Sequence, residues 1–368
     1  MKAIIPIIIL VVFLSILAGA NIYLVKRLSQ FFDVTNLTIL YFISGLLSIF
    51  MIAGVIGAAN SISTMGHIIY IIAAITMGLL LYLLISTFVV DILRLFTNFK
   101  PLIYGLMVLV ITFVAISYGT WNSFNTKLTN IEIPVSGIDN DIRIIQLSDV
   151  HVGHFRGVGW LQKIVDIIVD VDIDFVVITG DLFDGRINLN SQTLEPLKKI
   201  KVPIYFVEGN HDGYSGSNEI KLLLRDAGII VLENEIANFK DLQIIGLNHL
   251  LADDGSLNMH APGNHSTIKS ALSELNINKD QPSLLLHHSP DGIEYASEKG
   301  IDVYLAGHTH AGQLFPVNYI AKLLFTYNKG LHDYNGTRIF VSQGVGTFGP
   351  PMRIGTISEM SLITLKSL

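Results

Sequence analysis

The chain has 368 residues, of which 51% are hydrophobic and 15% charged, and its mean hydropathy is +0.54. These values are too apolar for an ordinary soluble enzyme, so we expect a membrane part beside a soluble domain. The sequence has no cysteine, which excludes disulfides, thiolate metal sites and cysteine nucleophiles. A transition-metal site would therefore be built from His, Asp, Asn and Glu side chains.

Charge divides the chain near residue 121. Residues 1–120 hold 5 basic and 2 acidic side chains, which leaves 19 basic and 28 acidic side chains for residues 121–368. The first part is near +3 and the second near −9. We therefore expect an anchor over residues 1–125 and a soluble domain over residues 126–368.

Apolar segments in the first part are long enough to cross a membrane, which takes about 20 residues per helix. No charged residue occurs at positions 3–25, 34–90 or 101–126, and a polar turn at 60–66 interrupts the middle run. The predicted helices cover residues 3–25, 37–58, 67–90 and 102–122, and Pro101 suits the start of the last one. A cleaved signal peptide ending near residue 20 is the alternative interpretation of the first helix.

The loops between these helices predict an orientation. Positive charge gathers in the first and third loops, at Lys26, Arg27, Arg94 and Lys100. By the positive-inside rule both termini lie outside the cytoplasm, so we expect a multi-pass cell-membrane protein with an extracytoplasmic soluble domain. The apolar runs lack the charged residues that mark a transport path, which favours an anchor whose partner is the lipid bilayer. A sensor or lipid-presenting role is the alternative.

Short β-rich runs in the second part end repeatedly in Asp, Asn or His. Strands are predicted at 128–135 and 142–147 and in the runs FVVIT, PIYFV, SLLL and VYLA. Helical stretches separate several of them, at 158–170, 194–199, 218–226 and 266–275. Strands separated by helices predict an α/β fold, in which sites gather at the carboxyl ends of strands.

The residues at these strand ends form a consistent set of imidazole, carboxylate and amide groups. Each one alone is more often a solvated loop residue, but five strand ends of the same design favour one shared site. Such donors suit Mn, Fe, Zn, Co or Ni at a hydrolytic centre, and we favour Mn. The set is Asp149, His151, Asp181, Asp184, Asn210, His211, Asp212, His287, His288, His308 and His310.

Five motifs in this region occur in a recognisable order. The series SDVH, GDLFD, GNHD, HHSP and GHTHAGQ resembles the calcineurin-like metallophosphoesterases over residues 128–368. The ending GTRIFVSQGVGTFGPPMRIGT is most similar to the bacterial membrane-associated, YkuE-like phosphodiesterase branch. We therefore expect an α/β protein in which the four transmembrane helices predicted from the apolar runs are followed by the β-sandwich flanked by helices that the resemblance implies.

The resemblance also assigns roles to the strand-end residues. It implies a first divalent ion on Asp149, His151 and His310, and a second on Asn210, His288 and His308. Asp181 would bridge the two ions. His211 would be a non-ligand imidazole near the leaving oxygen, oriented by Asp184. His287 and Asp212 are expected outside the ligand set.

The expected activity is hydrolysis of a phosphodiester or pyrophosphate bond by metal-activated water, with His211 as proton donor. The predicted membrane tether favours a cell-envelope or lipid-linked substrate. The apolar segment 314–330, with Phe315, Tyr319 and Leu323, would then be a cap that meets an acyl chain or the bilayer. A covered core helix is its alternative.

Two other function classes stay open. One is a catalytically silent, metal-stabilised sensor or binding module, against which the intact His211 and Asp184 argue. The other is a nuclease, but the acidic second part makes nucleic acid an unexpected partner. Outside the site, His154 and Arg353 are candidates for substrate contact, Arg353 alternatively for a structural salt bridge. The remaining histidines of the second part are expected at the surface: His249, His260, His265 and His332.

Overall fold

The computed structural model describes residues 4–256 and 266–368, so the expectations for His260 and His265 lie outside the described residues. The chain divides into two compact units. The first comprises residues 1–59, 63–121 and 349–352, and the second comprises residues 60–62, 122–348 and 353–368. A short C-terminal segment, residues 349–352, thus belongs to the unit formed by the N-terminal helices.

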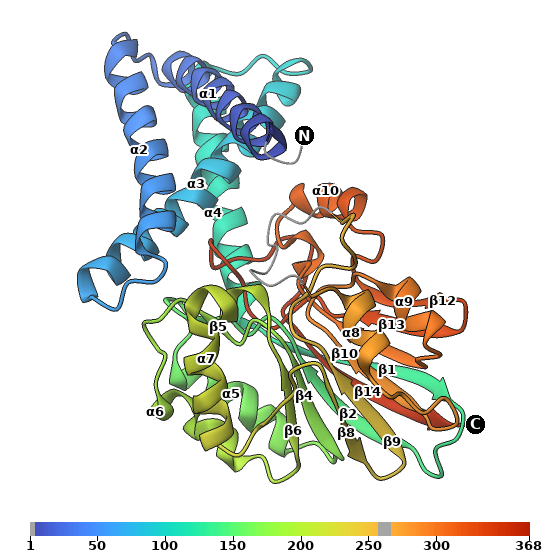
Figure 1. Ribbon diagram of the computed structural model, residues 1–368. Helices are drawn as coiled ribbons and strands as arrows, with labels where there is room; N and C mark the ends of the chain where they lie inside the picture. Colours follow the sequence, from blue (N-terminus) through green and yellow to red (C-terminus); the bar gives the residue numbers. More distant parts are fainter. Residues whose placement is uncertain (1–3, 257–265) are drawn as a thin grey trace. The chain divides into compact units, whose positions relative to one another are not determined.

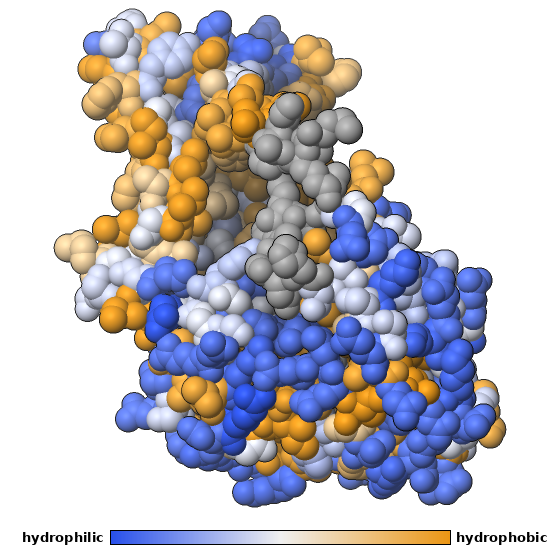
Figure 2. Space-filling model, viewed as in Figure 1, coloured by the Kyte–Doolittle hydropathy of each residue, from blue (hydrophilic) through white to orange (hydrophobic). Residues whose placement is uncertain are grey.

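The first unit is built from helices that are long and apolar enough to cross a membrane. Their bounds are α1 Ile4–Phe32, α2 Leu37–Ala58, α3 Thr64–Arg94 and α4 Pro101–Phe124 (Figure 1). Large apolar side chains cover their outer surface, as Figure 2 shows in orange, and Phe42 and Phe113 are both 71% exposed. Such an exterior is stable in hydrocarbon and unfavourable in water, so it fits a membrane environment.

Helix α1 continues seven residues beyond its predicted end at residue 25. The reason is an ion pair that the charge pattern alone does not show. Arg27 Nε lies 2.6 Å from Asp91 Oδ2, and the Tyr23 hydroxyl donates a hydrogen bond to the same oxygen at 2.6 Å. Because helix α3 supplies the partner, basic residues can occur inside α1 without ending it.

The second unit contains two six-stranded sheets (Figure 1). The first has the order β1 Lys127–Val135, β14 Glu359–Ser367, β2 Ile142–Leu147, β4 Phe175–Thr179, β6 Ile204–Val207 and β7 Ile230–Val231. The second has the order β12 Gly330–Tyr334, β13 Thr337–Val341, β11 Val303–Ala306, β10 Ser283–Leu286, β9 Leu242–Gly246 and β8 Glu235–Phe239. A small parallel pair joins β3 Val152–Gly153 and β5 Phe183–Asp184.

The sheets pack face to face, and helices cover their outer faces. A central core joins side chains of both sheets, including Phe175 and Val177 from β4 with Leu284 and Leu286 from β10. The outer core of the first sheet includes α5 and α7, and that of the second includes α8 and α9. The helical segments are α5 Val158–Val169, α6 Ser191–Leu194, η1 Glu195–Lys199, α7 Asn210–Asp226, α8 Ile268–Glu274, α9 Ile293–Glu298, η2 His310–Gly312 and α10 Val317–Leu324.

This arrangement confirms the predicted α/β fold, with apolar helices first and a helix-flanked sandwich after them. Strands β2, β4, β6, β10 and β11 are apolar on both faces because both faces are covered. That is why they appear in the sequence as short continuous apolar runs. Their carboxyl ends carry the ligand-type residues.

Candidate metal centre

The loops that follow the central strands of both sheets converge at one end of the sandwich. Gln146 on β2 joins the sheets there, because its Nε2 donates hydrogen bonds to Thr179 Oγ1 and to the Ala306 carbonyl, both at 2.9 Å. The backbone N–H of His308, after β11, donates to Asp149 Oδ2 at 3.0 Å. Residues far apart in the sequence are thereby fixed next to one another.

A first group of potential metal ligands consists of Asp149, His151 and His310. The Nε2 atom of His310 lies 3.2 Å from Asp149 Oδ1 and 3.1 Å from His151 Nε2. All three side chains are buried. Two imidazoles and a carboxylate whose donor atoms point at one another form a plausible three-ligand cage for one divalent ion.

A second group consists of Asp181, His288 and His308. His288 Nε2 lies 3.1 Å from Asp181 Oδ2 and 3.2 Å from His308 Nδ1. Because His288 Nδ1 is 2.8 Å from the Thr179 carbonyl, it carries the proton and leaves the Nε2 lone pair for a metal. Asp181 also faces the first group, with its Oδ2 atom 3.8 Å from His151 Nε2.

Two observations in this structure test whether these residues suit metal ions. Among the described residues, Asn210 Oδ1 and Asp149 Oδ1 are buried without a hydrogen-bond partner. A buried acceptor without a donor is costly unless a ligand completes it. Burial also lowers the pKa of His151 to about 3 and holds the pKa values of His308 and His310 below their usual range. These imidazoles are therefore neutral at pH 7, the form that binds metals.

His211 and Asp184 form a pair at the edge of the two groups. His211 Nδ1 lies 2.9 Å from Asp184 Oδ1, and 25% of the His211 side chain is exposed, whereas the ligand-type imidazole of His288 is fully buried. Burial alone would lower the pKa of His211, but the charge of Asp181 and the hydrogen bond to Asp184 raise the pKa to about 9. The pair thus provides an accessible, protonated imidazole.

The backbone around the site is held in an uncommon conformation. The left-handed φ angles are 54° at Asp149, 52° at His151, 52° at Asp181, 71° at His308 and 48° at His310. For residues with a side chain this region costs about 1–2 kcal/mol each. Unusual backbone at several neighbouring residues is typical of functional sites, where the surrounding fold stabilises it.

Glycines allow the closest approaches of backbone to ligand. A Cβ atom on Gly209 would lie 2.1 Å from Asp181 Oδ1, and one on Gly307 would lie 2.5 Å from Asp149 Oδ2. Neither position has room for a side chain. The glycines beside the candidate ligands are therefore required by packing.

Comparison with known proteins identifies the family of this region. Residues 142–312 match the family model of the calcineurin-like phosphoesterases. The chain carries a calcineurin-like metallophosphoesterase domain. The matched segment runs from β2 through the His308–His310 turn and so contains all nine residues to which the resemblance assigns a metal-binding or catalytic role.

Relatives carry the same family name and cover more of the chain. A zebrafish (Danio rerio) "Transmembrane protein with metallophosphoesterase domain" is 34% identical over 71% of this chain and 62% of its own length. An "Uncharacterized metallophosphoesterase" of Helicobacter pylori strain J99 is 33% identical over 65% of this chain and 64% of its own length. Bacillus subtilis YkuE is 28% identical over 61% of this chain and 79% of its own length. The chain thus spans less than two thirds of the first two relatives.

Several other residues of the metallophosphoesterase domain have structural partners. His287 is enclosed, because its Nδ1 lies 2.7 Å from the Ser289 carbonyl and its Nε2 accepts the Leu250 N–H at 3.1 Å. Asp212 accepts the N–H groups of Phe183 and Gly209, both at 3.0 Å, at the start of α7. Both side chains therefore orient the loops, and neither is available to a metal.

Arg353 is fully buried and forms no salt bridge in the described structure. Its guanidinium donates to the carbonyls of Gln343 and Gly346, each at 2.7 Å, and contacts His310 Nδ1 at 3.1 Å. The salt-bridge expectation for Arg353 is wrong among the described residues, because the guanidinium binds carbonyls of the loop behind His310. His154 is buried as well.

His249 was expected at the surface and is instead only 6% exposed, beside the second group. Its ring centroid lies 5.8 Å from that of His288 and 6.0 Å from that of His308. The sequence did contain a signal, because Leu247-Asn248-His249 follows the apolar strand β9 and so repeats the pattern of the other strand ends. His249 is an additional candidate site residue.

Proposed function

We propose that this protein is a membrane-anchored, dinuclear-metal phosphohydrolase that cleaves a phosphodiester or pyrophosphate bond. The observation that carries the proposal is the position of Asp181 between two ligand groups. Asp149, His151 and His310 would hold the first ion, and Asn210, His288 and His308 would hold the second. Asp181 would be the carboxylate that both ions share.

The chain's own residues supply positioning and a proton. When bound, the two divalent ions neutralise phosphate oxygens and lower the pKa of water. His211, protonated and held by Asp184, donates its proton to the leaving oxygen. Asp184 keeps the imidazole in one tautomer and stabilises its positive charge. Mn²⁺ is the ion we propose, and the sulfur-free set of nitrogen and oxygen donors also fits Fe, Zn, Co or Ni.

We further propose that the substrate is a lipid-linked phosphoester of the cell envelope. Helix α10, which follows the His308–His310 turn, exposes apolar side chains that an ordinary soluble domain would bury. Tyr319 is 62% exposed and Leu323 is 86% exposed. The Phe325 ring at the end of α10 meets the His308 ring edge-on at 5.9 Å. This exposed apolar surface contacts a candidate ligand imidazole, which supports the proposal that it binds an acyl chain or the bilayer surface.

The anchor and its orientation are parts of the same proposal. The four apolar helices and relatives named as transmembrane proteins point to a membrane protein. We propose an anchor over residues 1–125, a catalytic domain over residues 126–368, and an extracytoplasmic location for that domain. A reporter that is active on only one side of the membrane, fused to the C-terminus, tests this location.

Turnover of two substrate types tests the function. Purified full-length protein with Mn²⁺ should hydrolyse bis-p-nitrophenyl phosphate, and a silent binding module would not. Serine at Phe315, Tyr319 and Leu323 should lower kcat/KM for a lipid-bearing phosphodiester but not for the soluble one. Leu222→Ser, at a 62% exposed position on α7, is the matched control. Equal loss on both substrates, or a preference for DNA, would contradict the proposed substrate class.

A further inference from the structure

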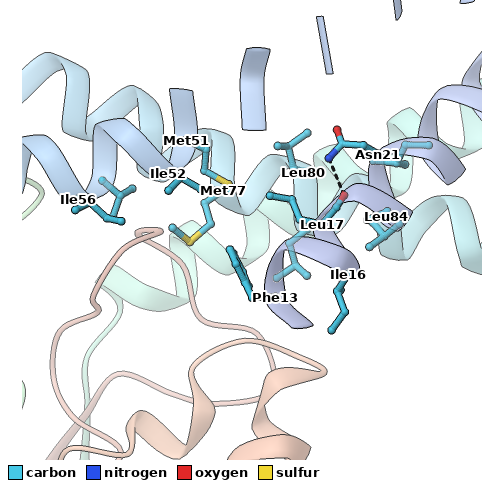
Figure 3. A pocket seen from close by; sticks show the side chains of 14 residues that line it. Phe13, Ile16, Leu17, Asn21, Met51, Ile52, Ile56, Met77, Leu80 and Leu84 are labelled. Carbon is cyan, nitrogen blue, oxygen red and sulfur yellow. Dashed lines mark hydrogen bonds between the residues drawn. The ribbon is translucent and has the colours of Figure 1, made fainter. Parts of the chain in front are cut away.

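A cavity of about 420 Å³ lies among helices α1, α2 and α3 of the first unit (Figure 3). Phe13 and Leu17 of α1, Met51 of α2, and Met77 and Leu80 of α3 form its wall. In Figure 3 these side chains point toward one another from the three helices. The volume falls in the range of about 300–1,000 Å³ that is usual for small-molecule sites.

The wall of this cavity offers a ligand almost no polar group. Its one polar lining residue is Asn21. The Asn21 Nδ2 group already donates to the Leu17 carbonyl at 2.8 Å and to Ser48 Oγ at 3.0 Å, and its Oδ1 accepts from Ser44. An apolar cavity of this kind excludes water and binds hydrocarbon. We conclude that the chemistry of the lining selects an alkyl chain.

The rim of the cavity is open and apolar. Ile16 is 65% exposed and Ile56 is 77% exposed, and both belong to helices long and apolar enough to span a membrane. In a bilayer such a rim adjoins lipid tails. A chain can therefore enter sideways without passing through water, and tight packing against Met51 and Met77 can favour one chain over bulk lipid.

One wall of the cavity is linked through the backbone to the candidate metal centre. Residues 349–352 belong to the first unit, where a Cβ on Gly349 would lie 3.8 Å from the sulfur of Met77. The preceding residue, Phe348, has its ring centroid 5.0 Å from that of His310 and 6.2 Å from that of His211. Phe348 and Gly349 are neighbours in the sequence, so the same loop supplies one residue to each unit.

We propose that this cavity binds a hydrocarbon chain of the lipid-bearing phosphoester whose phosphate is cleaved at the metal centre. The inference rests on the proposed function and deepens it, because it gives the N-terminal helices a part in substrate selection. Helices α1–α3 then hold the tail of the substrate in addition to anchoring the enzyme. Binding energy from the tail would lower KM for long-chain substrates and leave short soluble phosphodiesters unaffected.

Photolabelling locates the chain directly. The probe is a phosphodiester with one hexadecyl chain that carries a diazirine near its end, added to full-length His211→Ala protein with Mn²⁺ in lipid nanodiscs. We expect labelled peptides from the Leu17, Met51 and Met77 regions, and loss of this label when excess unlabelled hexadecyl phosphodiester competes. Label spread evenly over all lipid-facing helices, without competition, would overturn the inference.

A paired substitution on α1 tests the role of the cavity in catalysis. Ala20 lines the cavity, whereas Ala18 lies two residues away and is exposed without lining it. Ala20→Phe should raise KM for the hexadecyl phosphodiester at least fivefold and leave kcat/KM for bis-p-nitrophenyl phosphate unchanged, and Ala18→Phe should change neither value. An unchanged KM in Ala20→Phe, or equal loss on both substrates, would contradict the proposal.

The labelling and turnover results distinguish a wrong cavity assignment from a wrong substrate class. If the wild-type protein prefers lipid-bearing phosphodiesters but the label is diffuse, the cavity assignment is wrong and the proposed function stands. If the cavity is labelled with competition but no lipid-bearing phosphodiester is hydrolysed, the proposed substrate class is wrong, and the cavity is not a substrate site.

Discussion

Replacement of His211 by alanine should slow hydrolysis most when the leaving group is poor. The structure places an exposed, protonated imidazole beside the two ligand groups, with Nδ1 engaged by Asp184 at 2.9 Å. General acid catalysis of this kind contributes about 10²–10⁴-fold, which corresponds to about 2.7–5.4 kcal/mol in the activation barrier. A p-nitrophenolate leaves without help from a proton, whereas an alkoxide does not. The loss should therefore be near the upper limit for an alkyl phosphodiester and much smaller for bis-p-nitrophenyl phosphate.

Asp184→Asn tests how much the hydrogen bond between Asp184 and His211 contributes to catalysis. A hydrogen bond to a charged partner contributes about 1.5–3 kcal/mol, so the variant should lose about ten- to a hundredfold in kcat for the alkyl substrate. Steady-state rates for the two substrates, with metal content measured on the same samples, provide the assay. His211→Ala should retain its metals. Equal loss on both substrates, or metal loss that parallels the loss of turnover, would refute proton donation by His211.

Three further outcomes follow from the geometry of the domain. Gly209→Ala should lose metal while keeping its secondary structure, since its Cβ would lie 2.1 Å from Asp181 Oδ1. Gly213→Ala is the control, because its Cβ would lie 3.5 Å from the nearest atom. Metal content and circular dichroism measure both variants, and equal metal content in the two would contradict the prediction. Phe175→Ala should lower the free energy of unfolding by about 3–5 kcal/mol, because the ring is fully buried between the sheets, and a loss below about 1 kcal/mol in denaturant titration would contradict this packing. Mn²⁺ binding at pH 7 should release a proton from His288, because Asp181 outweighs the effect of burial and raises the pKa of His288 to about 10. Calorimetry in two buffers of different ionisation enthalpy should therefore give different heats of binding. Equal heats would show that His288 is neutral before the metal binds.

The strands that carry the candidate site could be predicted from the sequence because burial on both faces makes them short and continuously apolar. The strand predicted at 142–147 coincides with β2, and the predicted helix at 158–170 nearly coincides with α5. Polar residues directly after such strands lie at one edge of a sheet, so their convergence follows from the fold class. Asn248 and His249 follow strand β9 in the same way, but they belong to none of the five motifs, so the motif pattern does not predict His249 at the site.

Other features depend on contacts between residues distant in the sequence. Helix α7 begins at Asn210, eight residues before its predicted start, because Asp212 caps its first turn and Gly216, with a φ of 125°, lets the helix continue through a kink. Arg353 resembles an exposed phosphate ligand in the sequence but is buried among carbonyls of its own loop. Local patterns do not reveal such partners, since the distances arise only when the chain folds.

Anomalous X-ray scattering from crystals of the Mn²⁺-loaded full-length protein measures the shared-carboxylate arrangement directly. We predict two separate peaks with the Asp181 carboxylate between them, one beside Asp149, His151 and His310 and the other beside Asn210, His288 and His308. A single peak, or two peaks that Asp181 does not contact, would contradict a dinuclear centre at this site.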